Sequence, residues 1–566
     1  MIKFETYKNL LPILTFGVIL MHCSSEENAI NDYKDAAFIK SQLNKYAAVD
    51  ITYDESLLSE SDKIVLDKLV EAAKYMDEIF LRQVYRLNPA IHAELITGSD
   101  PAYPTLIKYF TINFGPFDRL DNDKPFINLR TPKPAGANYY PEDITKAEFE
   151  EWLQNHPEDE EAFISNFTVI KREGERLIAV PYSEAYRKFL VPAANLLKEA
   201  AQHSENASLK KYLNSRAEAF LSNDYFQSDV DWMDLEDHTI EVVIGPYEVY
   251  EDQLFGYKAG FESFITIVDP EESEKLRKVS KYLQELEMNL PIPDKHKNLN
   301  RGSSSPIVVV QEVYTSGDTK AGVQTTAFNL PNDERVREAK GSKKVMLKNI
   351  ARAKYNKCWI PIVNTVLDEK DLKRVSFDAY FNHVLMHEMS HGLGPGIIEK
   401  QGKETTVNKE LQESYSTMEE AKADILGLYS LKFLIGKGVF PKKMENEVYS
   451  SFLGGIFRSV RFGITSAHGG ANVCALNYIM EKGGFEFDDK SVKFRVNDKK
   501  IDIAVKDLAH DLLMIQALGD YDGAKSFIEK YRRISPELQK ALDKLKDVPV
   551  DILPNYAILN KSISSK

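Results

Sequence analysis

The spacing of apolar residues divides the chain into regions of different character. In Ser61 to Arg86 and Ser183 to Ser222 apolar residues recur every three or four positions with few breakers, which predicts amphipathic helices. Thr239 to Val268 and Pro306 to Phe328 are rich in β-branched residues, which predicts strands. The helical pattern of Glu271 to Leu290 separates these strand regions. The first part of the chain is therefore expected to mix helices with a sheet.

The last third of the chain is helical in pattern almost throughout, from Ala379 to Leu545. A length of 566 residues exceeds what one simple core usually serves, and the 43% of apolar residues suffices to bury two cores. The sequence therefore predicts an α+β protein of two lobes.

The charge of the chain limits its partners. The formal net charge is -14, which argues against a nucleic-acid partner because phosphate binding requires clustered lysine and arginine. Basic runs such as Lys343 to Lys348 are short, and we expect their side chains to be solvated.

The amino-terminal segment has the features of an export signal. A basic start precedes the apolar run Leu10 to Met21, which is too short for an ordinary membrane span, and Cys23 follows it. This arrangement resembles a bacterial lipoprotein signal, with cleavage before Cys23, lipid on its sulfur and attachment to the outer membrane of the cell envelope, on the periplasmic or surface face. The alternatives are a cleaved secretory signal or a simple anchor. Cys358 and Cys474 are expected to be free buried thiols.

The pentapeptide HEMSH, residues 387–391, carries the clearest chemical signal. On an α-helix, His387 and His391 lie one turn apart on the same face, so both imidazoles can reach one metal ion. Glu388 is rotated by about 100° from His387 and can address a water bound to that ion. The pattern predicts a zinc site that activates water.

A second helical segment supplies a further ligand. In Tyr415 to Leu428 an apolar stripe leaves Glu420 and Asp424 one turn apart on another face. We assign Glu420 to the metal, and Asp424 to the spare ring N–H of His387, whose tautomer it would fix. The alternative is that these acids form the solvated face of an amphipathic helix. The third histidine of metzincins is absent, because Ile397 stands at its position.

Two further segments carry candidate chemistry. His468 lies among small residues just before the apolar run Val473 to Met480, which suits a side chain that approaches a substrate closely, although a lone histidine is more often structural. Tyr247 lies in a turn after the strand-like segment Ile240 to Ile244. By itself this turn could be ordinary loop chemistry.

These segments together resemble the dipeptidyl peptidase III family of zinc exopeptidases. The HExxH form followed by HGLGP is similar to the shorter bacterial branch of that family, and the resemblance covers roughly Tyr182 to Leu545. Glu420 to Asp424 is similar to the family's E-x-[RK]-A-[DE] helix. NLPN at Asn329 to Asn332 is similar to its substrate-holding N-x-P-N, and FESF at Phe261 to Phe264 to its F-E-[GS]-F element.

The resemblance implies one Zn²⁺ per chain and a role for each motif. The implied zinc ligands are His387, His391 and Glu420, and the implied partners of the ligand histidines are Asp424 and Glu419. The implied catalytic residues are Glu388, His468 and Tyr247, and the implied substrate-binding residues are Asn329, Asn332 and Glu262.

Departures from the family limit what the resemblance implies. The family glutamate that grips the amino terminus of the substrate is Gly245 here, and an arginine four places after the position of His468 is Asn472. Glu248 and Glu251 are the candidates to replace the lost amine anchor. The C-terminal extension of full-length members is also largely missing. Zinc hydrolysis is therefore better supported than the strict release of dipeptides.

The resemblance also implies the architecture: a mainly helical zinc-binding lobe that faces a mixed α/β lobe, partly a small β-barrel, across a wide cleft. The expected segments are a lipoprotein signal peptide (1–22), a tether (23–45), the first part of the mixed lobe (46–268), a helical segment of the zinc lobe (269–304), the second part of the mixed lobe (305–358), the helical zinc-binding lobe (359–545) and a C-terminal tail (546–566).

The resulting interpretation is zinc-dependent hydrolysis of short oligopeptides by a monomer, with Glu388 as the base that takes a proton from water. Tyr247 and His468 would stabilise the oxyanion, while Asn329 and Asn332 would hold the peptide in an extended pose. Two alternatives are a surface peptide-binding lipoprotein with a structural zinc, and a zinc hydrolase of non-peptide amides. Intact Glu388 weighs against the first, because a structural site needs no base beside its ligands.

Overall fold

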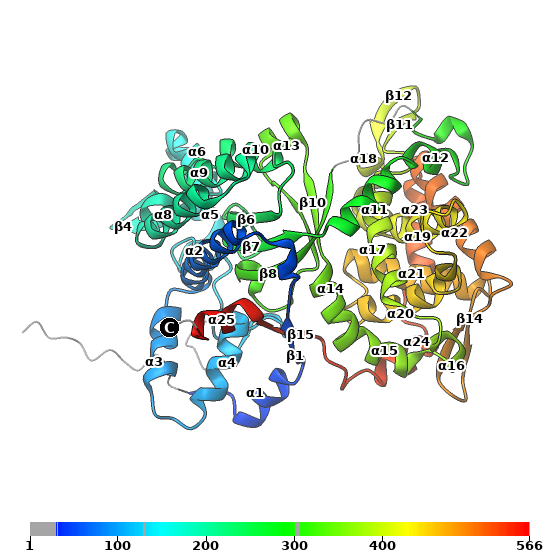
Figure 1. Cartoon of the computed structure of the whole chain (residues 1–566), viewed down its shortest axis with the longest axis horizontal. Helices are drawn as coiled ribbons and strands as arrows, with labels where there is room; N and C mark the ends of the chain where they lie inside the picture. The colour runs from blue at the N-terminus through cyan, green and yellow to red at the C-terminus, as the bar shows by residue number, and fades with distance from the viewer. Residues whose placement is uncertain (1–29, 31, 128–131, 300–305, 565–566) are drawn as a thin grey trace, which may run out of the picture.

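The protein consists of two lobes that meet along the middle of the molecule (Figure 1). The structure, a computed structural model, describes residue 30 and residues 32–127, 132–299 and 306–564. Cys23 and the expected signal peptide lie outside the described residues. We call the described residues up to 268, 306–358 and 550–564 the mixed lobe, and residues 269–299 and 359–549 the helical lobe.

A five-stranded sheet forms the centre of the mixed lobe, in the order β6-β7-β8-β10-β9. Neighbouring strands are antiparallel except β8 and β10, which are parallel. The strands are β6 (Ile240–Glu248), β7 (Gly260–Val268), β8 (Ile307–Gly317), β9 (Ala327–Leu330) and β10 (Lys343–Leu347). Among the described residues the edge strands β6 and β9 do not pair with each other, so the sheet is open and the expected barrel is not confirmed.

Amphipathic helices cover this sheet, as the apolar spacing predicts. The longest, α2 (Glu60–Val84), begins with a capping box between Ser59 and Asp62 and packs on β7, β8 and α8. The predicted helical regions 61–86 and 183–222 are confirmed as α2 and as α8 with α9. The other elements of the lobe are α1 (Ala36–Leu43), β1 (Tyr46–Ile51), α3 (Asn88–Thr97), α4 (Tyr103–Asn113), β2 (Phe117–Asp118), β3 (Lys124–Pro125), α5 (Lys146–Asn155), α6 (Glu160–Ile164), β4 (Thr168–Glu173), β5 (Arg176–Pro181), α7 (Tyr182–Ala185), α8 (Arg187–His203), α9 (Ala207–Ser222), α10 (Phe226–Met233), α13 (Glu334–Lys340), β15 (Asp551–Tyr556) and α25 (Ala557–Ser564).

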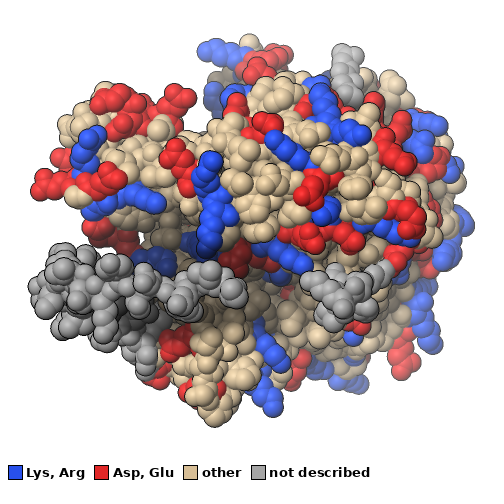
Figure 2. All heavy atoms as spheres, turned by 60° about the vertical axis from the view of Figure 1, so that its left-hand side comes forward, with Lys and Arg blue, Asp and Glu red and all other residues tan. Residues whose placement is uncertain are grey.

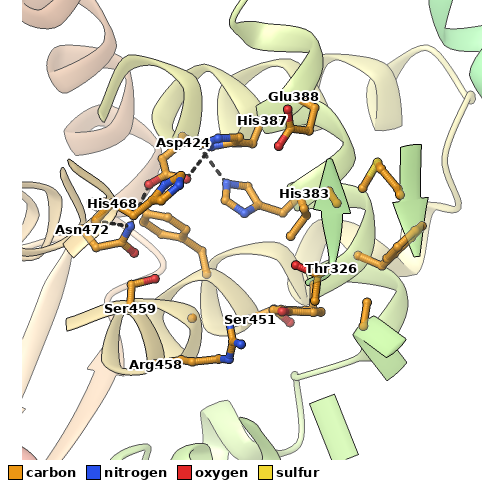
Figure 3. A pocket seen from close by; sticks show the side chains of 18 of the residues that line it. Thr326, His383, His387, Glu388, Asp424, Ser451, Arg458, Ser459, His468 and Asn472 are labelled. Atoms are coloured by element: carbon orange, nitrogen blue, oxygen red, sulfur yellow. Dashed lines mark hydrogen bonds and ion pairs between the residues drawn. The ribbon is translucent and has the colours of Figure 1, made fainter. Parts of the chain in front are cut away.

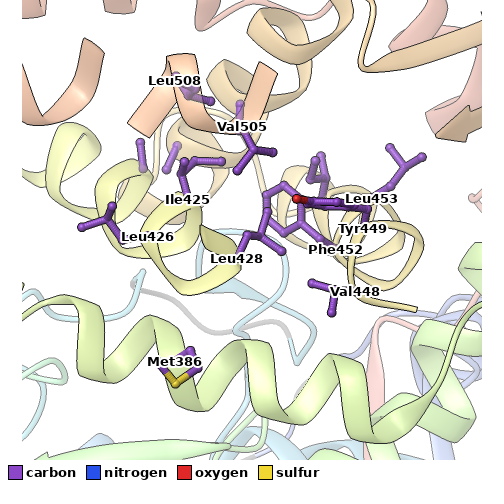
Figure 4. Close-up of a cluster of buried hydrophobic side chains, with 14 of the residues drawn as sticks. Met386, Ile425, Leu426, Leu428, Val448, Tyr449, Phe452, Leu453, Val505 and Leu508 are labelled. Atoms are coloured by element: carbon purple, nitrogen blue, oxygen red, sulfur yellow. The ribbon is translucent and has the colours of Figure 1, made fainter. Parts of the chain in front are cut away.

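Long helices pack around one hydrophobic core in the helical lobe. The central helix α19 contacts α17, α21 and α22. Figure 4 shows Ile425 and Leu428 of α19 between Met386 of α17 and Val505 of α22. The helices are α11 (Pro270–Ser280), α12 (Leu283–Met288), α15 (Ile360–Val366), α16 (Glu369–Leu372), α17 (Phe377–Ser390), α18 (Val407–Leu411), α19 (Tyr415–Gly436), α20 (Val448–Val460), α21 (Ala467–Glu481), α22 (Ile501–Ala517), α23 (Tyr521–Tyr531) and α24 (Pro536–Asp543). Two short hairpins, β11 (Ile397–Lys400) with β12 (Lys403–Thr406) and β13 (Phe485–Asp488) with β14 (Lys493–Val496), interrupt the expected helical region.

One continuous helical run links the lobes. Helix α14 (Lys348–Lys354) leads through a π-helical turn, Tyr355–Trp359, into α15. Cys358 is buried in the core of the mixed lobe, whereas Trp359 is buried in the core of the helical lobe. Successive residues therefore anchor the same turn in both lobes. Cys358 and Cys474 are free and buried, as expected, and burial raises the pKa of the Cys358 thiol to about 11.

The expected tether and tail are wrong in part. Residues 36–43 of the tether form helix α1, because Ile39 finds a hydrophobic partner surface on the N-terminal helices. Residues 551–556 of the tail form strand β15, which pairs in parallel with β1. Asp551 on this strand is fully buried and makes an ion pair with the buried Lys354. The tail is therefore an integral part of the mixed lobe.

The basic run Lys343 to Lys348 is not solvated, which corrects another expectation. On β10, Lys343 points into the mixed lobe, where it is 3% exposed and lies 3.3 Å from Glu241 Oε2. Lys348 lies 2.8 Å from Glu272 Oε1 of the helical lobe. Strand alternation turns Lys344 to the face opposite Lys343, toward the helical lobe.

The face of the molecule in Figure 2 carries acidic and basic side chains interspersed with each other. Within the described residues, the helices are all too short or too polar to cross a membrane.

Candidate metal centre and active site

Helix α17 carries the HEMSH motif into the interior of the helical lobe. Ser376 caps the start of the helix by accepting a hydrogen bond from the Ala379 N–H. His387 is 6% exposed near the end of the helix, and His391 is the residue that ends it. The Nε2 atoms of the two rings are 3.2 Å apart. The helix thus presents both imidazoles to one point.

Helix α19 brings Glu420 against α17. The two helices approach closely because Gly427 packs on the backbone of His387: a Cβ at position 427 would lie 3.0 Å from the His387 nitrogen. As a result, Glu420 Oε2 lies 3.3 Å from His387 Nε2 and 3.9 Å from His391 Nε2. The structure therefore brings the three predicted ligands together from two helices.

His387, His391 and Glu420 have the geometry and chemistry of a metal site. Their ligand atoms all lie within 4.8 Å of one another. Ligands about 2.0–2.1 Å from a tetrahedral zinc ion are separated by roughly 3.3 Å. Two of the three observed separations, 3.2 and 3.3 Å, agree with this value, and the third, between His391 and Glu420, is longer at 3.9 Å. Glu420 Oε2 is buried and accepts no hydrogen bond from the described residues, although histidine nitrogens surround it. Two imidazole nitrogens and a carboxylate oxygen fit zinc.

A carboxylate contacts the Nδ1 atom of each ligand histidine, on the side of the ring opposite the proposed metal position. Asp424 Oδ1 lies 2.8 Å from His387 Nδ1, and Glu419 Oε1 lies 3.0 Å from His391 Nδ1. Asn472 donates a hydrogen bond of 2.9 Å to the other oxygen of Asp424. These contacts orient the rings and leave both Nε2 atoms facing Glu420. Asp424 and Glu419 thus lie where the sequence places them.

The charges of the site shift several pKa values. Burial acts to lower the pKa of His387, but Asp424 outweighs it and raises that pKa to about 10 in the metal-free chain. Burial acts to raise the pKa of Glu419, but Lys422 and then His391 lower it to about 2. Burial acts to raise the pKa of Glu420, but the neighbouring His387 and His468 outweigh it and lower that pKa. A bound metal must therefore displace a proton from His387.

Glu388 faces the mixed lobe, where Lys344 of β10 meets it. Lys344 Nζ lies 2.7 Å from Glu388 Oε2, and the two side chains are 19% and 21% exposed. Burial acts to raise the pKa of Glu388, but Lys344 and then His387 outweigh burial and bring the pKa below its usual value. Lys344 therefore keeps the carboxylate charged.

A cavity of ≈ 460 Å³ lies beside the metal group, between the lobes (Figure 3). His387, Glu388 and His468 line one part of it, and Thr326 and Ala327 of the mixed lobe line another. His468, at the start of α21, is 66% exposed, and its Nδ1 lies 3.0 Å from Glu420 Oε2. A molecule bound in this cavity would contact both lobes.

Tyr247 lies away from the cavity beside the metal group. Its side chain is buried on β6, its hydroxyl lies 3.4 Å from Asp229 Oδ1, and Arg216 packs over its ring. It does not line the cavity. Gly245, two residues earlier, has a φ of 151°, and a Cβ there would lie 2.7 Å from Arg216 Nη1. A side chain at position 245 would therefore be strained by this backbone conformation, and Arg216 would have to shift to make room for it.

The residues expected to bind substrate lie on the sheet. Asn329 Oδ1, on the edge strand β9, is buried without a hydrogen-bond partner in the described part of the chain. Asn332 donates a hydrogen bond of 3.0 Å to the Tyr247 carbonyl. Glu262 on β7 is 2% exposed, and burial raises its pKa well above the usual carboxyl value. None of the three lines the cavity beside the metal group.

Of the two acids considered as replacement amine anchors, Glu251 is already engaged. It is 2% exposed and lies 2.9 Å from Arg119 Nη2 and 2.7 Å from Lys133 Nζ. Its use as an anchor is therefore wrong. Glu248 ends β6, and its burial raises its pKa although Asn332 hydrogen-bonds to it.

Three residues near the metal group were not singled out from the sequence. His383 lies one turn before His387, and its Nε2 is 2.9 Å from the Asp424 carbonyl oxygen. Its spacing of four residues from His387 was a signal that could have revealed it. Lys344 and Arg458 reach the site from other elements, so only the fold reveals them.

The chain is similar to known proteins over most of its length. A model described as peptidase family M49 matches residues 166–430. A structure of DPP III from Caldithrix abyssi is 57% identical, covers 92% of this chain and 99% of that chain, and has a TM-score of 0.90. A structure of dipeptidyl-peptidase III from Corallococcus sp. strain EGB is 44% identical, covers 94% and 99% of the two chains, and has a TM-score of 0.77.

Curated relatives carry two different names. Nudix hydrolase 3 of Arabidopsis thaliana is 40% identical over 597 residues, which cover 96% of this chain and 76% of the plant protein, and its name differs from those of the peptidases. Dipeptidyl peptidase 3 of Mus musculus is 25% identical over 279 residues, which cover 43% of this chain and 36% of the mouse protein. Given the family model and the two near full-length structural matches, the chain belongs to peptidase family M49, the dipeptidyl peptidase III family of metallopeptidases.

Proposed function

We propose that the chain is a zinc-dependent peptidase that cleaves short oligopeptides. The observation that carries this proposal is the combination on α17 of two ligand histidines with an acid, Glu388, that lines the adjoining cavity. His387, His391 and Glu420 would hold the zinc ion. When bound, zinc supplies Lewis-acid polarisation of a carbonyl and a water whose pKa is lowered to about 7.

The side chains around the cavity supply the proton transfers. Glu388 is charged at neutral pH because Lys344 outweighs burial and holds its pKa below the usual value, so it can accept a proton from the attacking water. The same carboxyl group then delivers that proton to the leaving amine. His468 reaches the cavity from α21 and would donate a hydrogen bond to the developing oxyanion.

The mixed lobe would hold the peptide. Asn329 Oδ1 lacks a partner among the described residues, so it is free to accept a main-chain N–H of an extended substrate. Tyr247 could serve as a second oxyanion donor only after a rearrangement, because its hydroxyl lies against Asp229 and outside the cavity.

The test is incubation of the purified, zinc-loaded protein with a mixed oligopeptide library, with cleavage positions determined by mass spectrometry. Glu388→Gln should stay folded and zinc-bound and lose about 100-fold to 10,000-fold in rate. Glu399→Gln, which alters an exposed acid on β11, should cleave at the wild-type rate.

Each alternative function has its own outcome in this experiment. Wild-type rates in Glu388→Gln would refute the role of Glu388. If the unaltered protein binds peptides but cleaves none, the peptide-binding alternative replaces the peptidase. Cleavage of non-peptide amides with intact peptides would instead identify an amide hydrolase.

A further inference from the structure

Arg458 is a cation in the wall of the cavity beside the metal group, and it has no counter-charge among the described residues. It lies on α20, is partly buried, and forms no ion pair or hydrogen bond with the residues that the structure describes. Its Nε atom is buried and finds no acceptor in the described part of the chain. Buried polar groups are normally paired, because an unpaired group costs free energy. An unpaired guanidinium in a cavity wall therefore points to a ligand.

The acids in the same wall are already engaged. Glu388 pairs with Lys344, and Asp424 pairs with His387. Figure 3 shows Arg458 across the cavity from His387 and Glu388. The cavity thus has the metal group and the base on one side and an unpaired cation on the other.

The surroundings of Arg458 carry excess positive charge. Burial is the main cause of the lowered pKa values of Lys354 and Arg461, and the charge of Arg458 contributes to both. Asp551 lies 2.9 Å from Lys354 Nζ and neutralises that lysine. Arg461 donates hydrogen bonds to backbone carbonyls only. Among the described residues, Asp551 is therefore the one acid that forms an ion pair with any of these three cations, and Arg458, which lines the cavity, has no acid of its own.

We infer that Arg458 forms an anion subsite for a carboxylate of the peptide substrate, an inference that rests on the proposed peptidase function. A guanidinium matches a carboxylate through two parallel hydrogen bonds. The wall of the same cavity includes Phe381, Val384 and Phe452, so apolar parts of the peptide can be buried there. The carboxylate is the free carboxyl terminus of a short peptide or an acidic side chain near the scissile bond.

Calorimetry with matched peptides tests this subsite without hydrolysis. The zinc-loaded Glu388→Gln protein would be titrated with tetra-alanine and with its C-terminal amide. In amide-capped tetrapeptides, glutamate would then be compared with glutamine at each position. The acid should bind about 10-fold to 100-fold more tightly than the matched amide in one arm, because hydrogen bonds between charged groups are strong. The arm that shows the preference identifies the source of the carboxylate.

Arg458→Met in the same background isolates the contribution of the guanidinium. Glu388→Gln leaves Lys344 without its carboxylate partner both in the protein that keeps Arg458 and in the Arg458→Met variant. Any binding of the peptide carboxylate by Lys344 therefore cancels in the comparison. The methionine keeps the length and apolar contacts of the side chain, so the acid preference should vanish while the amide peptides bind as before. Arg458→Lys should retain part of the preference. Arg374→Met, which removes an arginine that lies 2.7 Å from Asp498, should retain all of it.

Thermal melting separates a ligand-binding role from a structural one. Because Arg458 has no partner to lose, Arg458→Met should leave the Tm of the peptide-free protein unchanged or raise it. A Tm lower by several degrees, or an acid preference that survives in Arg458→Met, would overturn the subsite. The library experiment is an independent test. If peptides are cleaved but the acid preference is absent, only the subsite is refuted. If peptides are neither cleaved nor bound, the proposed function is refuted as well.

Discussion

Lys344 and Glu388 join the two lobes next to the cavity beside the metal group, with Nζ and Oε2 2.7 Å apart. Lys344 Nζ also lies 3.3 Å from the carbonyl oxygen of Glu388. On the neighbouring strand, Lys344 is paired in register with Asn329. One lysine therefore connects the proposed base with the strand expected to hold the substrate.

Lys344→Met should shift the acid limb of kcat/KM to higher pH. Burial acts to raise the pKa of Glu388 and Lys344 is the largest influence that lowers it, so loss of the lysine lets this pKa rise. A base must be deprotonated, so the variant should lose activity at a higher pH than the wild type as pH falls. Lys344→Arg should restore the profile. Lys340→Met, which breaks a 2.7 Å ion pair with Asp234 inside the mixed lobe, should not shift it. An unshifted limb in Lys344→Met would contradict the prediction.

Zinc binding should release about one proton at neutral pH. In the metal-free chain Asp424 outweighs burial and raises the pKa of His387 to about 10, so the ring is protonated at neutral pH. Below that pKa, the apparent zinc affinity should increase as pH rises. Calorimetry in buffers of different ionisation enthalpy counts the released protons. Asp424→Asn should release fewer protons and bind zinc about 10-fold to 100-fold more weakly. Zinc uptake without proton release would count against this arrangement.

Gly427→Ala should weaken zinc binding although it removes no ligand. The added methyl would lie 3.0 Å from the His387 nitrogen and 3.3 Å from its Cα, so α19 must move away from α17 and carry Glu420 with it. We expect a loss of stability of about 1–3 kcal/mol. Gly436→Ala is the control on the same helix, because nothing lies within 4 Å of its added methyl. It should be neutral or stabilise by up to about 1 kcal/mol. Equal zinc affinities in the two variants would show that this helix contact does not set the site.

Cys23→Ser tests the proposed lipid anchor. The variant should move from the membrane fraction to the soluble fraction, because an acyl chain contributes about 0.8 kcal/mol for each buried methylene. Ser24→Ala should stay with the membrane. Membrane association of the serine variant would indicate an uncleaved apolar segment or a protein partner.

The ligand pattern could be predicted because it is local. His387 and His391 need only a helix to become neighbours, and the same holds for Glu420 and Asp424. The register of α17 against α19 depends on a tertiary contact at Gly427, which has no signature in a single sequence. The ion pair between Lys344 and Glu388 across the two lobes could not be predicted for the same reason.

The strands that were missed have a similar explanation. The residues of β10 begin with two lysines, so they look like a solvated basic run, although Lys343 finds a buried partner in Glu241. Strand β15 lies in an expected tail, and its only partner strand is at the other end of the described chain. Local spacing predicts elements that bury a face nearby, and it fails where the partner is distant.

The pair of β1 and β15 also has a consequence for the order in which the protein is made. Asn555 donates a hydrogen bond to Asp50 across a separation of 505 residues. At about 5–20 residues per second, ribosomal synthesis of that span takes roughly 25–100 s. During this interval the helices of the helical lobe are all translated. Until β15 emerges, β1 has an unpaired edge that can pair with other chains. Completion of the first lobe is thus a late event in biogenesis, and the nascent chain depends on protection of one short strand until its partner emerges.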